Sequence, residues 1–90
     1  MATKKDLLNF LFKEKPLKVL LVLSDGLPKN ITQIYKKVRT TYSHTLNILS
    51  VMYDLNIIEF EKRGRDKVVR LTKKGEKIVE VLKSILSDFL

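Results

Sequence analysis

Residues 31–58 constrain this 90-residue chain more than any other stretch. Their first segment, ITQIYKKV, has Ile34 and Val38 four residues apart, so both side chains fall on one side of a short helix. A short turn, RTT, follows, and Thr41 is placed to cap a second helix over residues 42–55. The stretch therefore predicts two helices, joined by a tight turn, that lead the chain into a strand.

The longer of these helices divides into two faces at 100° per residue. Its apolar face carries Thr45, Ile48, Leu49, Met52 and Leu55. Its opposite face carries Ser43, Asn47, Ser50 and Asp54, with His44 and Val51 on the flank. Such a helix is expected to bury one side in its own domain and to present short polar groups on the other.

Two further helices are expected before this stretch. The first covers residues 4–14, with Thr3 as its N-cap, and its apolar side chains spread over about half of its circumference. The second covers residues 16–24 and starts at Pro16, which is tolerated in a first turn. It is nearly all apolar and is expected to be the central buried helix, and Gly26 suits a left-handed C-terminal position.

Three local signals place the connections around the motif. Residues 27–30 are expected to form a loop, and Thr32 is a reasonable N-cap for the helix that follows. At the far end, Asn56 stands where a helix terminus favours a residue that tolerates positive φ.

The last third of the chain predicts a hairpin and a helix. Residues 57–62 and 67–71 alternate as strands around a turn that contains Gly64. Because a lone two-stranded hairpin is marginal in water, it is expected to lean on the helices. Thr72 can cap a last helix over residues 73–90. The fold class expected is therefore mainly α with a small β-hairpin.

Charge favours particular partners for the chain. Lysine and arginine number 18 against 10 acidic residues, a net charge of +8, which favours a polyanion or an acidic membrane surface. Residues 57–77 carry eight basic and four acidic side chains, whereas residues 78–90 carry one basic and two acidic. There is no cysteine, hence no disulfide framework and no thiolate zinc site. Since the apolar run of residues 19–23 is far short of a spanning helix, we expect a cytoplasmic protein that does not enter a membrane.

Several short segments, taken in order, resemble the winged helix-turn-helix regulators of the broad MarR, ArsR and PadR group. They are ITQIYKKV, then Leu49 and Met52 ahead of Asn56-Ile57-Ile58, then Lys62-Arg63-Gly64-Arg65, then Leu71-Thr72-Lys73-Lys74-Gly75. The resemblance implies one winged-helix domain over residues 1–90, with its core at 16–72 and a C-terminal dimerisation helix at 73–90. The thiolate metal motifs of ArsR-type sensors are absent, and we expect no metal or cofactor.

The helix over residues 42–55 has the division of faces that a DNA major groove requires, since the groove admits one α-helix. Ser43, His44, Asn47 and Ser50 are expected to reach base edges or phosphates. Asn47 is the best candidate for a base, because an amide pairs bidentately with adenine and discriminates by ~1–3 kcal/mol. The alternative is an ordinary solvated helix face, with His44 simply exposed.

Cations and hydroxyls beside that helix are expected to hold phosphates without reading sequence. Around the turn these are Lys36, Lys37, Arg39, Thr41 and Tyr42. In the basic wing, residues 62–67, they are Lys62, Arg63, Arg65 and Lys67, which are placed to flank a minor groove. The alternative for the wing is a solubilising turn whose cations pair with Glu59, Glu61 and Asp66.

The first and last helices carry more apolar surface than one small core absorbs. A fully covered Leu, Ile or Phe gains ~1.5–3 kcal/mol over an exposed one, so the remainder favours a second copy related by two-fold symmetry. The expected interface residues are Leu8, Phe12, Ile78, Leu82, Ile85, Leu86 and Phe89. The alternative is a compact monomer that packs these side chains internally.

Three functions remain open on the sequence. The first is a sequence-specific, dimeric transcription regulator that binds double-stranded DNA. The second is a low-specificity, nucleoid-type DNA coating protein, and the third is a winged-helix module that binds an acidic protein partner. An enzyme is not expected, because the sequence has no nucleophile–base set, metal cluster or phosphate loop. A crevice at a dimer interface could hold a small-molecule effector, but the sequence gives no support for one.

Overall fold

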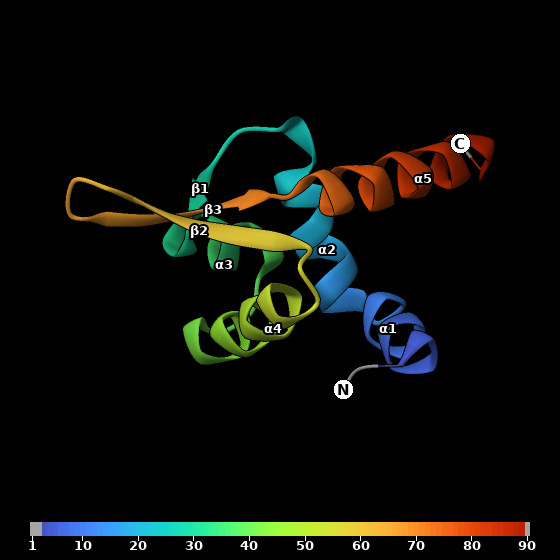
Figure 1. The fold of residues 1–90 in the computed structure, drawn as a ribbon, viewed down its shortest axis with the longest axis horizontal. Helices are drawn as coiled ribbons and strands as arrows, with labels where there is room; N and C mark the ends of the chain where they lie inside the picture. Colours follow the sequence, from blue (N-terminus) through green and yellow to red (C-terminus); the bar gives the residue numbers. More distant parts are fainter. Residues whose placement is uncertain (1–2, 90) are drawn as a thin grey trace.

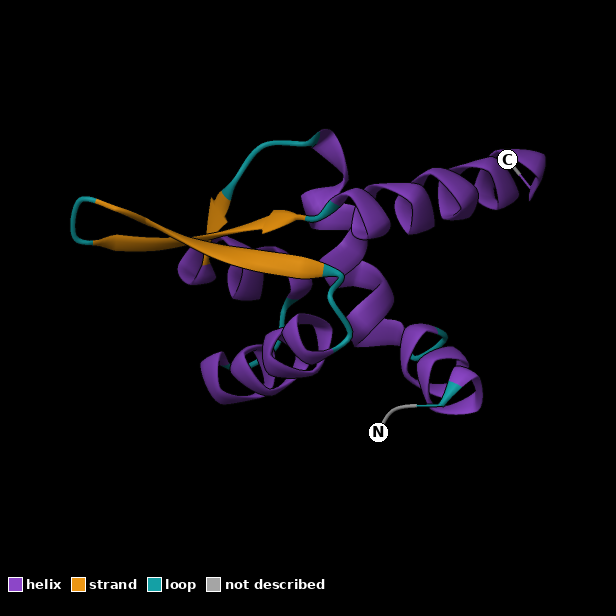
Figure 2. Ribbon diagram, in the orientation of Figure 1, coloured by secondary structure: helices purple, strands orange, loops and turns teal. Residues whose placement is uncertain are grey.

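The computed structural model describes residues 3–89, except for the side chains of Leu7 and Phe89. Five α-helices and a three-stranded sheet occupy this range, which confirms the expected mainly α fold class (Figures 1 and 2). The hairpin β2–β3 projects from one end of the molecule and α5 from the other (Figure 1). The elements are α1 Lys4–Leu11, α2 Glu14–Val22, the 3₁₀ helix η1 Leu23–Asp25, β1 Lys29–Asn30, α3 Ile31–Val38, α4 Tyr42–Asp54, β2 Ile58–Arg63, β3 Asp66–Leu71 and α5 Lys73–Phe89.

The sheet is antiparallel in the order β1-β3-β2, so β3 lies in the middle. Lys29 pairs with Val69 on one side of β3, and Phe60 pairs with Val69 on the other. The expectation of a loop over residues 27–30 is therefore wrong at its last two positions. A two-residue strand is too short for side-chain alternation to reveal it, and only the pairing with β3 defines it.

The core lies between the helices and the inner side of the sheet. It is formed by Leu11, Val19, Leu20, Leu23, Ile34, Val38, Ile48, Leu49, Met52, Ile57, Ile58, Val69, Leu71 and Val79. The α2 helix contributes Val19 and Leu20 to this core, as expected of a central helix, but its Leu21 stays 39% exposed. Burying α2 on every side would need a further layer that a chain of this size does not supply.

The first helix ends earlier than residue 14, and α2 starts before Pro16. Phe12 and Lys13 interrupt the two helices, and Lys13 has extended backbone angles as the N-cap of α2. In a continuous helix Pro16 would have no backbone N–H to donate to the Phe12 carbonyl. The proline ring would also clash with that carbonyl. Within α2, Pro16 is in the first turn, where backbone N–H groups have no intrahelical partner.

A capping box fixes the start of α3. Asn30 Oδ1 accepts from the backbone N–H of Gln33 at 2.8 Å, and Gln33 Oε1 accepts from the backbone N–H of Asn30 at 2.9 Å. The N-cap is therefore Asn30, and the expectation of Thr32 is wrong, because the reciprocal bond satisfies two backbone donors at once.

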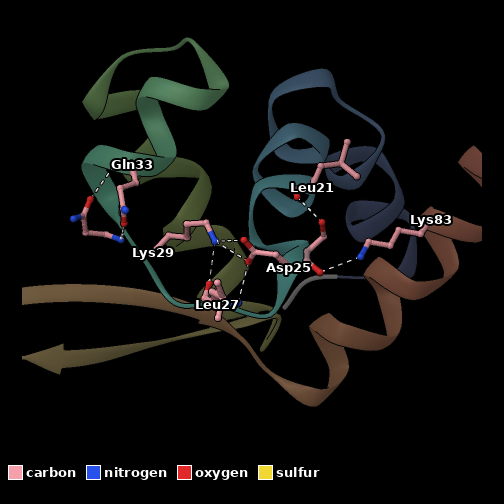
Figure 3. Close-up of polar contacts among 8 residues, drawn as sticks. Leu21, Asp25, Leu27, Lys29, Gln33 and Lys83 are labelled. Atoms are coloured by element: carbon pink, nitrogen blue, oxygen red, sulfur yellow. Dashed lines mark hydrogen bonds and ion pairs between the residues drawn. The ribbon is translucent and has the colours of Figure 1, made fainter.

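A polar cluster joins the α2–α3 connection to α5 (Figure 3). The buried ammonium of Lys29 lies 2.6 Å and 2.7 Å from the two carboxylate oxygens of Asp25, and Lys83 donates to the Ser24 carbonyl at 3.0 Å. The Lys29 ammonium, with the Leu27 backbone N–H, lowers the pKa of the Asp25 carboxyl. Since the folded pKa is the lower one, this stabilisation is present above the unfolded pKa and is lost as pH falls through the folded pKa.

Close packing sets the direction in which α5 leaves the sheet. A side chain at Gly75 would overlap the carbonyl oxygen of Ile57, so only glycine lets the helix lie this near. Thr72 Oγ1 donates to the Asn56 carbonyl at 2.7 Å and accepts from the Gly75 backbone N–H at 3.0 Å. Asn56 itself has φ of 61°, as expected at the end of α4. These contacts tie the start of α5 to the end of the motif.

Candidate nucleic-acid interface

The turn between α3 and α4 is made by residues that take unusual backbone or capping roles. Arg39 adopts a left-handed conformation, φ 59° and ψ 53°, at the C-terminus of α3. Thr41 Oγ1 accepts from the His44 backbone N–H at 3.1 Å, which confirms Thr41 as the N-cap of α4. The rings of Tyr35 and Tyr42 meet edge to face with centroids 5.9 Å apart. The cap therefore fixes the start of α4, and the aromatic pair holds that start against α3.

The two faces of α4 lie as the periodicity predicts. Thr45, Ile48, Leu49 and Met52 are buried against the rest of the domain. Ser43, His44, Asn47 and Ser50 are exposed together on the other side, and within residues 3–89 their side chains form no hydrogen bond. This face is hence available to a partner.

Apolar side chains flank this polar face, and the sequence reasoning did not single them out as contacts. Leu46 and Tyr53 are exposed on one flank, and Val51 on the other. A cleft of about 330 Å³ separates the Val51 flank from the corner between α1 and α2. Its lining includes Phe10, Pro16, His44, Asn47, Ile48 and Val51. Periodicity along α4 alone does not reveal this cleft, because its other wall comes from the end of α1 and the start of α2.

The cations expected around the turn are exposed, but other lysines are used internally. Lys36, Lys37 and Arg39 are open to solvent, and Tyr42 is half-exposed. Lys15, in contrast, reaches the carbonyls of Val38 and Arg39 at the end of α3, at 3.5 Å and 3.4 Å. The net charge of +8 thus overstates the number of free cations near the motif.

The register of β2 and β3 separates the wing into two faces. Ile58, Phe60 and Lys62 pair with Leu71, Val69 and Lys67 on the inner face, which continues the buried side of the sheet. Glu59, Glu61 and Arg63 pair with Arg70, Val68 and Asp66 on the outer face. Because side chains alternate along a strand, the two sets point to opposite sides.

Ion pairs occupy the outer face of the wing. Arg70 lies 3.2 Å from a Glu61 carboxylate oxygen and 4.0 Å from one of Glu59, and Arg63 lies 3.5 Å from Glu61. Arg63 therefore has an acidic partner inside the hairpin, as the alternative interpretation of the wing expected. Lys62, Arg65 and Lys67 form no ion pair with any other residue between positions 3 and 89.

The inner face carries an aromatic contact to α4 that was not expected from the sequence. The rings of Tyr53 and Phe60 are tilted with centroids 5.5 Å apart, and the ammonium of Lys67 lies 4.4 Å from the centroid of Phe60. The inner face of the wing is thus the face turned towards α4. The sequence shows a tyrosine near the end of α4 and an aromatic residue in the strand, but only the tertiary fold brings them together.

A separate apolar patch lies at the end opposite the wing. Leu8, Phe12, Ile85 and Leu86 are exposed there, and so is Val81, which was not among the expected interface residues. Ile78 and Leu82 are partly buried against the core, while the side chain of Phe89 lies outside the described part of the structure. Phe12 and α5 border a groove of about 290 Å³ whose further lining is Lys77, Ile78, Val81, Leu82 and Ile85.

Residues 3–89 offer neither a membrane-spanning helix nor a metal-binding cluster. None of the helices in this range combines the length and apolar character needed to cross a bilayer. Histidine and carboxylate side chains in this range do not gather in threes, so these residues offer no cluster suited to a metal ion.

The chain is similar in sequence and in structure to proteins from the archaeon Archaeoglobus fulgidus. An uncharacterized protein of Archaeoglobus fulgidus is 36% identical over 83 residues, which cover 88% of this chain and 87% of that protein. The crystal structure of AF1382 from Archaeoglobus fulgidus superposes with a TM-score of 0.80 at 34% identity, over 91% of this chain and 94% of that chain. Relatives of this identity and coverage show common membership of a family.

More distant structures share the fold. The MarR family transcriptional regulator SPO1453 of Silicibacter pomeroyi gives a TM-score of 0.77 at 24% identity, over 84% of this chain and 55% of that chain. The transcriptional regulator YodB of B. subtilis gives 0.79 at 20% identity, over 97% and 90%. No family model matches the sequence. The chain belongs to the family of these Archaeoglobus proteins, and its fold is the winged helix-turn-helix of the MarR-like regulators, as the sequence resemblance implied.

Proposed function

We propose that this protein is a dimeric transcription regulator that binds double-stranded DNA at specific sequences. One observation carries the proposal: the helix with the exposed polar face, α4, contacts the cationic inner face of the wing through the Tyr53 and Phe60 rings. The first is suited to base edges and the second to phosphates.

In this proposal α4 enters the major groove. Asn47 pairs bidentately with adenine, while Ser43, His44 and Ser50 contact neighbouring base edges or phosphates. Lys36, Lys37, Arg39, Thr41 and Tyr42 hold the backbone on either side and set the orientation of the domain. The support is the exposure of these side chains together with the absence of hydrogen-bond partners for the polar face of α4 among residues 3–89.

The wing contacts the adjacent minor groove or its backbone through Lys62, Arg65 and Lys67. These cations are free of ion pairs within the described range, whereas Arg63 already shares Glu61 with Arg70. We therefore assign Arg63 a smaller part in DNA binding than the other three.

Two copies associate through α1 and α5. Phe12 is 66% exposed and Val81 59% exposed, and the groove between them is lined mainly by apolar side chains. A second copy that covers this patch removes its apolar surface from water, which is favourable. Two-fold symmetry then presents two α4 helices to half-sites roughly 34–36 Å apart along the duplex.

Selection of bound duplexes from a random pool, with the molar mass of the protein measured in parallel, tests the proposal. The expected result is a two-fold symmetric site, a dimer, and a preference of ~10³ or more over random duplex in competition. A preference below about tenfold indicates a low-specificity coating protein instead. If no salt-dependent duplex binding occurs, the domain is a protein-interaction module that uses the same cations for an acidic partner.

A further inference from the structure

The wing places two like charges directly opposite each other. In the β2–β3 register Lys62 faces Lys67 on the inner side, and both side chains are exposed. Like charges at facing positions destabilise a hairpin. Glu59 and Glu61 pair with Arg63 and Arg70 on the other face, and neither lysine forms an ion pair within residues 3–89, although Glu61 and Asp66 line the same hollow as the two lysines. Like charges at facing positions, kept despite this cost, are typical of a functional surface, here one suited to binding an anion.

One of these two lysines is held in place by aromatic rings. Lys67 lies over the ring of Phe60, and Phe60 in turn packs on Tyr53 in the last turns of α4. A cation over a ring face is attracted by the negative charge of that face, so the ammonium is drawn towards Phe60 while it remains exposed. Tyr53, Phe60 and Lys67 thus form a stack that runs from α4 to the tip of the wing.

The stack joins the two elements that are proposed to touch DNA. Beyond its base the hairpin projects past the helices (Figure 1). Phe60 pairs with Val69 where β1 also joins β3, and its ring contacts Tyr53, so this contact links the base of the wing to α4. An anion bound by Lys67 therefore has a defined position relative to α4.

We propose that Phe60, supported by Tyr53, is a positioning residue that holds the Lys67 ammonium where a backbone phosphate lies when α4 occupies the major groove. This inference rests on the proposed DNA-binding function. It adds Phe60 and Tyr53, which are not proposed to form hydrogen bonds with DNA. Phe60 acts through Lys67, so replacing the ring removes the benefit of the lysine without removing its charge.

A double-mutant cycle in the full-length protein tests this coupling. Lys67→Ala is expected to weaken binding to the selected duplex about tenfold and to lower the slope of log K against log salt by ~1. Phe60→Leu is expected to produce most of the same loss of affinity. In the Phe60→Leu background, Lys67→Ala is expected to cause little further loss. Phe60→Tyr, which keeps the ring, is the matched control and is expected to stay within twofold of the unchanged protein.

A second readout requires no DNA. In the free protein the ε-methylene protons of Lys67 are expected to show an upfield ring-current shift in the NMR spectrum, retained in Phe60→Tyr and lost in Phe60→Leu. An unshifted Lys67 in the unchanged protein overturns the inference even if Phe60→Leu fails to fold. So does a cycle in which Lys67→Ala costs as much in the Phe60→Leu background as alone. A shifted Lys67 in a protein that binds no duplex contradicts the proposed function instead.

Discussion

The two ends of this molecule leave different kinds of surface open to solvent. The end formed by α4 and the wing exposes short polar side chains and lysines without ion-pair partners in the described range. The end formed by α1 and α5 exposes Phe12, Val81 and Ile85 around an apolar groove. The first surface suits a hydrated polyanion and the second a protein partner that excludes water. Opposite chemistry on opposite ends allows one copy to hold DNA and another copy simultaneously.

A finer contrast separates the lysines themselves. Lys29 is paired with Asp25, Lys83 donates to Ser24, and Lys74 donates to the Leu55 carbonyl at 2.9 Å. Lys62 and Lys67 in the wing have no such acceptors among the described residues. The first group stabilises connections and helix ends, and the second is free for a partner. Net charge therefore indicates the class of partner, while the contacts indicate which residues meet it.

The largest effect is expected from a charge placed in the apolar end. Ile85→Asp puts a carboxylate in the proposed interface, so the protein should become a monomer. Because two linked half-site contacts raise affinity by ~10²–10⁴ over one, binding to a two-half-site duplex should fall at least a hundredfold. Sedimentation equilibrium measures the mass, and a gel-shift titration measures the affinity.

Ser84→Asp is the matched control for this change, since it adds the same charge to an exposed position one residue away on α5. It should leave mass and affinity nearly unchanged. A dimeric Ile85→Asp protein with full affinity would show that the apolar end has another purpose.

A smaller and more local effect is expected at the polar end. Asn47→Ala should weaken binding to the selected duplex by ~1–3 kcal/mol and relax the preference at one base pair, because the amide is lost without any charge. Affinity for random duplex and the molar mass should not change. Competition with duplexes altered one base pair at a time measures this, and an equal loss at every sequence would make Asn47 a phosphate contact.

Sequence alone predicted the parts of the fold that depend on local signals. The periodicity of α4, the cap at Thr41 and the left-handed Asn56 all have short-range causes, and the structure has each where it was expected. The strand β1 and the cap at Asn30 were missed, because the first depends on a distant partner strand and the second on a choice between neighbouring capping residues.

The candidate site shows the same division. The exposed face of α4 follows from helical spacing, so Ser43 and Asn47 were identifiable from sequence. Which wing cations are free depends on strand register and on the partners of Glu61, which the sequence left open. The contact between Phe60 and Tyr53 joins two elements through the tertiary fold and has no local signature.

The smallest expected effect tests the contrast between lysines directly. Lys74→Met removes the ammonium that donates to the Leu55 carbonyl at the end of α4, so it should lower the free energy of unfolding by ~0.5–1.5 kcal/mol. Its DNA-binding salt slope should stay the same, because that ammonium is engaged away from the proposed DNA surface. Lys67→Met should do the reverse, with a slope lowered by ~1 and little change in the urea midpoint. If both variants lower the slope equally, the ammonium of Lys74 leaves the Leu55 carbonyl when DNA binds. In that case the contacts seen in the protein without DNA do not identify the cations that meet DNA.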